Sequence, residues 1–71
     1  MKLNLSQIIG KKCKIFIKQN YIVIGKIYSI DNYFNFLVYD TYICKSYKNI
    51  ILSDYSTLRF IRGENILVIK Y

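Results

Sequence analysis

Apolar and polar residues are patterned along nearly the whole chain, and the period of the pattern changes close to its start. Residues 3–9 (LNLSQII) carry apolar side chains at a spacing that suits one or two turns of helix. Asn4 or Ser6 would cap this helix and Gly10 would end it. The pattern therefore predicts a short N-terminal helix that stops before the main body of the chain.

From Lys12 onward the period is two, which is typical of half-buried strands. Cys13, Ile15 and Ile17 alternate with residues 14, 16 and 18, and Gln19-Asn20 supplies a turn. The next predicted strand runs from Tyr21 to Ile30, with Ile22, Ile24, Tyr28 and Ile30 on one face and a bend at Gly25. A turn at 31–33 leads to a long strand from Phe34 to Ile43 and a basic loop at 45–49. Strand segments follow at 50–52 and 57–61, separated by 53–56, and a turn at 62–65 precedes the last strand at 66–69.

One helix followed by consecutive strands with short turns predicts a mainly β fold in a single domain spanning residues 1–71. Curved antiparallel strands of this length form a small barrel, because twist and a bulge bring the sheet edges together. A chain this short does not satisfy every edge, and an unpaired edge invites pairing with another subunit. The pattern therefore favours self-association or assembly with similar chains.

Composition strengthens the expectation of partner subunits. The sequence is 54% hydrophobic and 17% aromatic, which is high for a domain with so much surface per residue. Lysines, asparagines and aspartates interrupt every apolar stretch, so we expect no membrane span, and the first residues do not resemble a secretory leader. Part of the apolar surface is therefore expected to face other subunits.

The chain is also strongly basic, with 11 Lys and Arg against 4 Asp and Glu and a formal net charge of +7. Such a balance suits a polyanionic partner through phosphate attraction and counterion release. It equally suits a surface that needs charge to stay in solution. The abundant Ile, Tyr, Lys and Asn have AT-rich codons, so genome bias offers a further source of the lysines. Charge alone therefore leaves the function open.

Cys13 and Cys44 lie far apart, among hydrophobic residues and without the spacing of paired metal ligands. We interpret them as buried reduced thiols, with a single disulfide as the alternative, and as a weak indication of a reducing compartment. The chain has no histidine, so no ordinary Ser-His or Cys-His nucleophile pair can form. Its carboxylates show no catalytic spacing, and we expect no enzymatic activity, no cofactor and no metal.

Two predicted turns carry the polar groups that could act together. Asn35 offers an amide suited to the Watson–Crick edge of a base, and Tyr33 offers a flat face for stacking. Arg62 could cover the other side of that base or take a phosphate. Gly63 permits positive φ and close backbone approach, and Asp31 can accept bonds from turn amides and from Asn35 or Arg62. Taken singly, each is ordinary turn or surface chemistry.

In this order, the two turns resemble the paired motifs of the Sm and Sm-like (LSm) family. Residues 25–36 (GKIYSIDNYFNF) are similar to the first motif, in which Gly, an apolar strand, Asp, an aromatic residue and Asn follow one another. Residues 60–66 (FIRGENI) are similar to the second, an apolar pair, Arg-Gly, any residue, Asn and an apolar residue. The resemblance covers nearly the whole chain, with Gln19-Asn20, Ile30 and Phe34 departing from the commonest residues.

The resemblance implies a short helix and a strongly bent five-stranded antiparallel sheet that assembles into rings of six or seven subunits. It implies uridine-rich single-stranded RNA on the inner rim, one nucleotide per subunit. Carried over by residue, Tyr33 would stack on the base, Asn35 would read its edge, Arg62 would close the pocket, Gly63 would give backbone access and Asp31 would brace the loop. The ring interfaces would be the strands at 57–61 and 66–69.

The resemblance also implies a type and a process. Arg62-Gly63, without the Lys-His of the bacterial version, favours a eukaryotic or archaeal type. The sequence is most similar to the second like-Sm subunit of the eukaryotic heptamers, with the sixth like-Sm subunit and the Sm F protein as competitors. This implies a role in pre-mRNA splicing within a spliceosomal small nuclear ribonucleoprotein (snRNP), in mRNA decay, or in both. The expected location is the nucleus, with the cytoplasm as an addition that the sequence does not decide.

Three alternatives remain open at the level of sequence. The chain could be a ring-scaffold interaction subunit that contacts little RNA, although it has every pocket residue. It could be a homo-oligomeric Sm-like RNA chaperone. It could also be a cold-shock or other oligonucleotide-binding barrel, although such modules place their aromatic residues on an exposed strand face and not in two turns.

Overall fold

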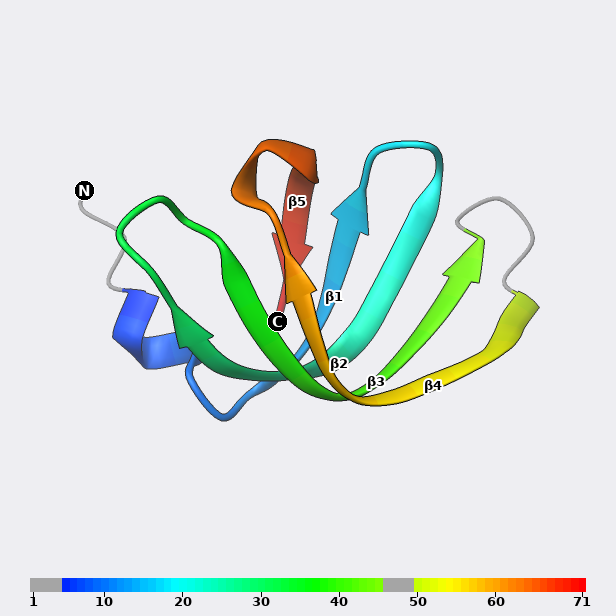
Figure 1. Ribbon diagram of the computed structural model, residues 1–71, viewed down its shortest axis with the longest axis horizontal. Coiled ribbons are helices and arrows are strands. Elements are labelled where there is room, and N and C mark those ends of the chain that lie inside the picture. The colour runs from blue at the N-terminus through cyan, green and yellow to red at the C-terminus, as the bar shows by residue number, and fades with distance from the viewer. Residues whose placement is uncertain (1–4, 46–49) are drawn as a thin grey trace.

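The computed structural model describes residues 5–45 and 50–71. Within them lie five strands and two short 3-10 helices (Figure 1). In chain order these are η1 (Leu5–Ile8), β1 (Lys12–Ile17), β2 (Tyr21–Ile30), β3 (Phe36–Lys45), β4 (Ile50–Ile61), η2 (Gly63–Asn65) and β5 (Ile66–Lys70).

The strands form one bent antiparallel sheet in the order β4-β3-β2-β1-β5 (Figure 1). β4 and β5 follow each other along the chain, yet they are the two outer strands of the sheet, which therefore remains unclosed. The predicted mainly β class, with five antiparallel strands in an open barrel, is confirmed. The bend brings the turn at the end of β4 and the loop between β2 and β3 to the same end of the molecule.

The predicted N-terminal helix is only a 3-10 turn of four residues, Leu5–Ile8. So short a segment makes too few backbone bonds to form an α-helix alone, and packing of one side chain holds it instead. That side chain is Ile8, which is 2% exposed. Gly10 ends the segment as predicted, with φ of 82°, and its amide donates to Ile27 O at 2.7 Å. Of the two proposed caps, Asn4 lies outside the described residues.

The first hairpin confirms the alternation read from the sequence. Cys13 and Ile15 are buried while Lys12 and Lys14, which alternate with them, are exposed. Gln19 and Asn20 both adopt positive φ, 72° and 64°, in the three-residue loop between the paired Ile17 and Tyr21. The turn joins β1 to β2 in antiparallel register.

The single face predicted for Ile22, Ile24, Tyr28 and Ile30 on β2 is wrong, although Ile22 is buried and Ile30 packs against the core. Val23 and Ile27 face the core, whereas Tyr28 is 62% exposed. The bend at Gly25 is confirmed, because the register with β3 shifts beside it and an added Cβ would lie 2.8 Å from the side chains of Thr41 and Val38. A further shift between residues 27 and 29 changes which face turns inward. A simple period of two cannot be read across two such irregularities.

Two predicted boundaries are corrected in the second half of the chain. Phe34 does not begin a strand: it lies in the loop with φ of 61°, and β3 starts at Phe36. The break predicted at 53–56 does not exist, because β4 is continuous from Ile50–Ile61. Tertiary bonds hold this polar stretch in the sheet, since the Thr41 hydroxyl donates to Ser56 O at 3.1 Å. Of the predicted basic loop, residues 46–49 lie outside the described residues.

The core lies between η1 and the bent sheet, and both cysteines are buried and free, as interpreted from the sequence. Its fully packed side chains come from η1 and from four of the strands. They are Ile8, Cys13, Ile15, Val23, Ile27, Phe36, Val38 and Ile61. Among the described residues, no helix is long and apolar enough to cross a membrane.

Candidate nucleic-acid interface

The two motif-bearing turns meet in the folded chain. The amide of Gly63 donates to Asn35 Oδ1 at 2.8 Å, which joins the end of β4 to the loop between β2 and β3. A Cβ added to Gly63 would lie 2.5 Å from Phe34 O and 2.9 Å from Tyr33 O. The predicted close backbone approach at Gly63 is therefore confirmed. The positive φ also considered there is wrong, because Gly10 is the one described glycine that adopts it.

Asp31 organises the loop from within. Its Oδ1 accepts the amides of Tyr33 at 2.8 Å and Asn35 at 2.9 Å, and its Oδ2 accepts Asn35 Nδ2 at 3.0 Å. These bonds favour the ionised carboxylate, and those from the amide and side chain of Asn35 do most to hold the pKa of Asp31 below its ordinary value. The predicted bracing of the loop is confirmed, and the partner is Asn35 and not Arg62.

Asn35 is fixed in orientation yet keeps hydrogen-bonding capacity. Its Nδ2 uses one of two hydrogens on Asp31, and its Oδ1 uses one of two lone pairs on Gly63. One donor and one acceptor therefore remain on the same amide. A donor beside an acceptor in one plane is the arrangement that can pair with a base edge.

Tyr33 and Arg62, each next in sequence or close to a residue of this bonded network, are exposed to solvent. Tyr33 is 82% exposed, the most of any large hydrophobic side chain in the described chain. Arg62 keeps 68% of its side-chain surface exposed and contacts Glu64 through Nε at 3.2 Å. An exposed ion pair of this kind is weak and easily exchanged for another anion. The site thus combines the hydrogen-bonded amide of Asn35 with the exposed ring of Tyr33 and the exposed guanidinium of Arg62.

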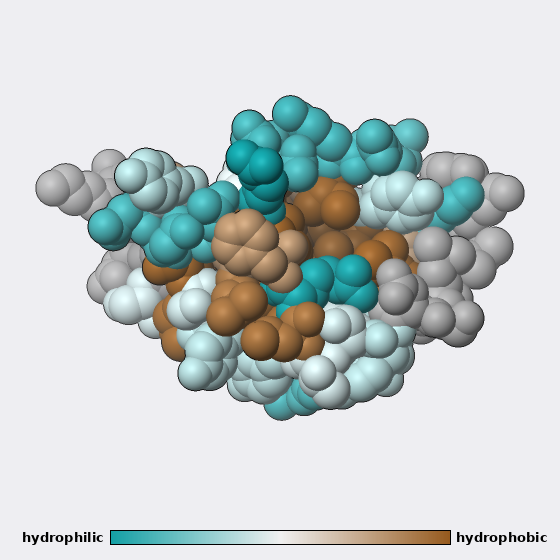
Figure 2. Space-filling view, in the orientation of Figure 1, coloured by the Kyte–Doolittle hydropathy of each residue, from teal (hydrophilic) through white to brown (hydrophobic). Residues whose placement is uncertain are grey.

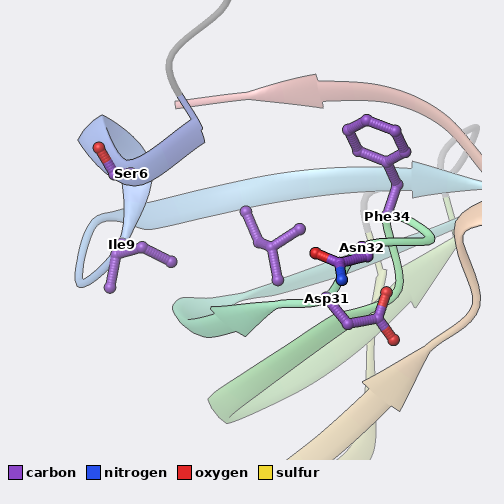
Figure 3. A pocket seen from close by; sticks show the side chains of 6 residues that line it. Ser6, Ile9, Asp31, Asn32 and Phe34 are labelled. Carbon is purple, nitrogen blue, oxygen red and sulfur yellow. The ribbon is translucent and has the colours of Figure 1, made fainter.

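Sequence reasoning missed two residues beside this network. Phe34 is 59% exposed in the loop, and Glu64 holds Arg62. A hollow of about 420 Å³ also opens between η1 and the loop, lined by Ser6, Ile9, Ile30, Asp31, Asn32 and Phe34. Figure 3 shows the Asp31 carboxylate turned away from Ser6 and Ile9. The Tyr33-Phe34 pair in a polar turn was a signal that an aromatic residue other than Tyr33 would be exposed.

The outer strands expose apolar side chains. Leu58 and Phe60 on β4 are 51% and 59% exposed, and Leu67 and Val68 on β5 are 62% and 50% exposed. Figure 2 shows apolar side chains gathered in the middle of the face over which β4 passes. Both strands also carry an unpaired backbone edge, since neither has a neighbour on its outer side. Apolar side chains beside an open edge are the feature that draws a further strand.

The described part of the chain holds no cluster of metal-ligating side chains. Across residues 5–45 and 50–71, no three His, Cys, Asp or Glu side chains come close enough to hold a metal ion. The two motif-bearing turns therefore remain the candidate site that the sequence predicted.

No protein-family model matches the sequence, and no curated protein matches it. Solved structures do match. The Pyrococcus abyssii Sm protein in complex with a uridine heptamer is similar over 97% of each chain, with a TM-score of 0.84 and 18% identity. A heptameric archaeal Sm protein matches 93% of this chain and 91% of its own, with a TM-score of 0.79 and 24% identity. This is the Sm fold.

This chain also matches a chain in the crystal structure of the NatC complex bound to CoA. That likeness covers 99% of this chain and 86% of the other, with a TM-score of 0.82 and 17% identity. The likeness to these structures lies in the backbone, because few residues are shared. The structural neighbours that support the predicted resemblance are therefore Sm and Sm-like proteins, with archaeal ring proteins among them.

Proposed function

We propose that this chain is an RNA-binding subunit of a ring of Sm-like subunits, and that it binds uridine-rich single-stranded RNA through Asp31, Tyr33, Asn35, Arg62 and Gly63. The observation that carries the proposal is the 2.8 Å bond from the Gly63 amide to Asn35 Oδ1. It joins two turns that are distant in sequence into one small site. The site offers a stacking face, a fixed amide and a cation, which are the groups used to hold an unstacked base.

Ring assembly is supported by the position of the outer strands. β4 and β5 bear the open edges at opposite ends of the strand order. If β4 of one copy pairs with β5 of the next, each junction adds backbone hydrogen bonds and buries the exposed Leu58, Phe60, Leu67 and Val68. Head-to-tail pairing of this kind closes into a ring when the rotation per subunit divides a full turn. The predicted interfaces at 57–61 and 66–69 lie within these two strands.

Solved neighbours give independent support. The archaeal Sm protein of similar fold is heptameric, and the Pyrococcus abyssii Sm protein is bound to a uridine heptamer. We extend both properties to this chain because its two motif turns meet at one site and its edges are open. The finer proposal is a subunit of a eukaryotic heteroheptamer, most like the second like-Sm subunit, which acts in the nucleus in pre-mRNA splicing, mRNA decay or both.

Binding of labelled oligouridine to the assembled protein tests the RNA proposal. Tyr33→Ala is expected to weaken binding by about 1–3 kcal/mol per base stacked, and Asn35→Ala and Arg62→Ala are expected to weaken it too. Tyr28→Ala is the matched control, because Tyr28 is also an exposed tyrosine but lies on β2, outside both turns, with its ring edge-on to Tyr39. Unchanged affinity and unchanged crosslinking in all three site variants would refute the RNA-contact proposal.

Native mass spectrometry tests the assembly proposal separately. The expected species is a ring of six or seven subunits, made of this chain or of this chain with co-purified subunits. Val68→Lys places a charge on the outer strand β5 and is expected to reduce the ring population, whereas Lys18→Ala, at the exposed end of the first hairpin, leaves it unchanged. A stable lone monomer of the unaltered protein at micromolar concentration would contradict ring assembly.

A second candidate function is an interaction subunit that uses the same fold with little RNA contact. The observation in its favour is the NatC likeness, since a chain of similar fold occurs in a complex bound to CoA. This alternative predicts assembly with other subunits that depends on β4 and β5, together with oligouridine affinity that does not respond to Tyr33→Ala. The two experiments above therefore separate it from the RNA-binding subunit.

A further inference from the structure

A row of side chains crosses the sheet on the face opposite to Cys13 and Ile15. In the antiparallel register, Lys70 of β5 pairs with Lys14 of β1, and Lys14 pairs with Ile24 of β2. Ile24 in turn pairs with Tyr42 of β3. Directly paired residues lie on one face with their Cβ atoms about 4.5–5.5 Å apart. The row therefore brings two lysines, an apolar residue and a tyrosine together from four strands.

A second row runs beside the first on the same face. Lys12 of β1 pairs with Lys26 of β2, and Lys26 pairs with Tyr39 of β3. Lys12 and Lys26 are both exposed. The two rows lie two residues apart along β1 and β2, so they are neighbours on the surface.

The placement of these lysines is unusual for side chains that serve solubility alone. Lys14 faces Lys70 and Lys12 faces Lys26, and like charges directly opposite each other destabilise a sheet. Within residues 5–45 and 50–71, none of the four forms an ion pair; the Lys70 ammonium lies 5.3 Å from the centroid of the Phe16 ring. Their pairing in register places four positive charges on one face of the sheet.

The same face is hollowed along these rows. One depression of about 380 Å³ is lined by Lys12, Cys13, Lys14, Ile24, Lys70 and Tyr71. A second of about 380 Å³ is lined by Lys12, Ile24, Gly25, Lys26, Asp40 and Tyr42. Lys12 and Ile24 belong to both, so the two depressions form one groove. Four lysines line it together with one carboxylate, Asp40, which accepts a hydrogen bond from the Tyr55 hydroxyl at 2.8 Å. Ile24 lies at its middle, and an exposed tyrosine stands at each end.

We propose that this groove, which we call the lysine groove, binds single-stranded nucleic acid without base specificity. Lys12, Lys14, Lys26 and Lys70 would contact successive phosphates, while Tyr42 and Tyr71 would stack on bases at the two ends. A cationic groove with aromatic side chains is the arrangement that tracks a single strand, because every base has a face that can stack. The site is separate from the two turns around Asn35 and Gly63, and it does not depend on them.

The groove fits a nucleic-acid strand better than a lipid surface. Stable binding to an anionic bilayer is favoured by cations together with apolar side chains that reach into the headgroup region. Here Ile24 is half-buried at the bottom of a depression. The tyrosines, 44% and 65% exposed at Tyr42 and Tyr71, lie where a threaded strand would present bases.

The test measures binding of labelled oligoadenylate RNA to the assembled protein as salt is varied, in a Tyr33→Ala, Asn35→Ala background that removes the proposed base contacts of the other site. Lys14→Gln with Lys26→Gln is expected to weaken binding at least about fivefold at low salt. It is also expected to lower the slope of log K against log salt by about 1.4, because each phosphate contact to a single strand contributes about 0.7. Tyr42→Leu is expected to weaken binding about tenfold with the salt slope unchanged.

The matched control is Lys18→Gln with Lys45→Gln, which removes the same charge from lysines outside the groove. This control is expected to change neither affinity nor slope by more than a small fraction of the groove variant's effect. Equal losses of RNA affinity in the groove variant and the control variant would show that binding depends on net charge alone, and would overturn the proposal. It would also be overturned if the groove variant kept its RNA affinity and instead lost binding to phosphatidylserine vesicles.

Discussion

The main-chain amide of Gly63 donates to the side-chain oxygen of Asn35 at 2.8 Å, across 28 positions of sequence. The same Asn35 side chain also bonds to Asp31, because its Nδ2 donates to Asp31 Oδ2 at 3.0 Å. The turn after β4 and the loop after β2 are therefore held by one chain of bonds. Any change at one of these three residues is expected to disturb both turns.

Gly63→Ala is expected to lower the free energy of unfolding by about 1–3 kcal/mol. The new Cβ would lie 2.5 Å from Phe34 O and 2.9 Å from Phe34 C, which are backbone atoms that cannot turn aside. Relief requires the two turns to separate, which also breaks the bond to Asn35. Urea unfolding followed by circular dichroism measures the change.

The control for this prediction is Gly10→Asn. Gly10 has φ of 82° but nothing within 4 Å of an added Cβ, and Asn tolerates the left-handed region better than other residues. The expected loss is below about 1 kcal/mol. A Gly63→Ala protein as stable as the unaltered one would mean that the close approach to Phe34 does not constrain the site.

Asp31→Asn is expected to destabilise the protein in a pH-dependent way. Hydrogen bonds from Asn35 and Tyr33 hold the pKa of Asp31 below its ordinary value. Because the folded-state pKa is the lower one, the stabilisation by the carboxylate is complete above the ordinary Asp pKa of about 3.9 and is lost as pH falls through the folded-state pKa. The difference in free energy of unfolding between the unaltered protein and the Asp31→Asn variant should thus be largest at neutral pH and shrink below about pH 4. A difference that stayed constant through this range in urea titrations would contradict the account.

Thr41→Val is expected to cost about 1–3 kcal/mol of stability. Thr41 is fully buried; its hydroxyl donates to Ser56 O at 3.1 Å and accepts from Arg59 Nε at 3.1 Å. Valine keeps the shape but leaves those two groups without their bonds to residue 41. Thr57→Val, at an exposed position on β4, should change the unfolding midpoint little. Equal midpoints for the two variants would show that the Thr41 bonds do not hold β4 in the sheet.

Native-state alkylation is expected to be slow at both cysteines. Cys13 and Cys44 are 1% and 6% exposed, and burial raises the pKa of the Cys13 thiol, an effect that nearby Lys11 opposes. Since the thiolate is the reactive form, both access and ionisation limit the reaction at Cys13. Iodoacetamide labelling followed by mass spectrometry should modify both cysteines rapidly in urea and neither in buffer. Rapid labelling of Cys13 in buffer would contradict its place in the core.

Much of the candidate site was predictable because its chemistry is local. Asp31, Tyr33 and Asn35 lie within five positions, and short polar side chains in such a segment bond to their own turn amides. Arg62 and Gly63 were identified in the same way, as a turn between two apolar strands. The exposure of Phe34 and the pairing of Arg62 with Glu64 were not predicted, because both depend on the direction that a side chain takes after folding.

The fold was predictable in outline and not in register. The alternation of Cys13 and Ile15 with lysines determined β1, and Gln19-Asn20 determined the first hairpin. The single face predicted for Ile22, Ile24, Tyr28 and Ile30 was wrong because two register shifts interrupt the period of β2. The polar stretch at 53–56 was mispredicted as a break because bonds from β3 keep it extended.

The sequence by itself determined that this chain is a mainly β protein with two polar turns of matching chemistry, since period and turn composition are local properties. Only the tertiary structure decided that those turns touch, through Gly63 and Asn35. It also decided that β4 and β5 carry the open edges and that four lysines line one groove. Each of these depends on strand register, which a bulge can shift by one residue without changing the hydrophobic pattern that specifies the strand.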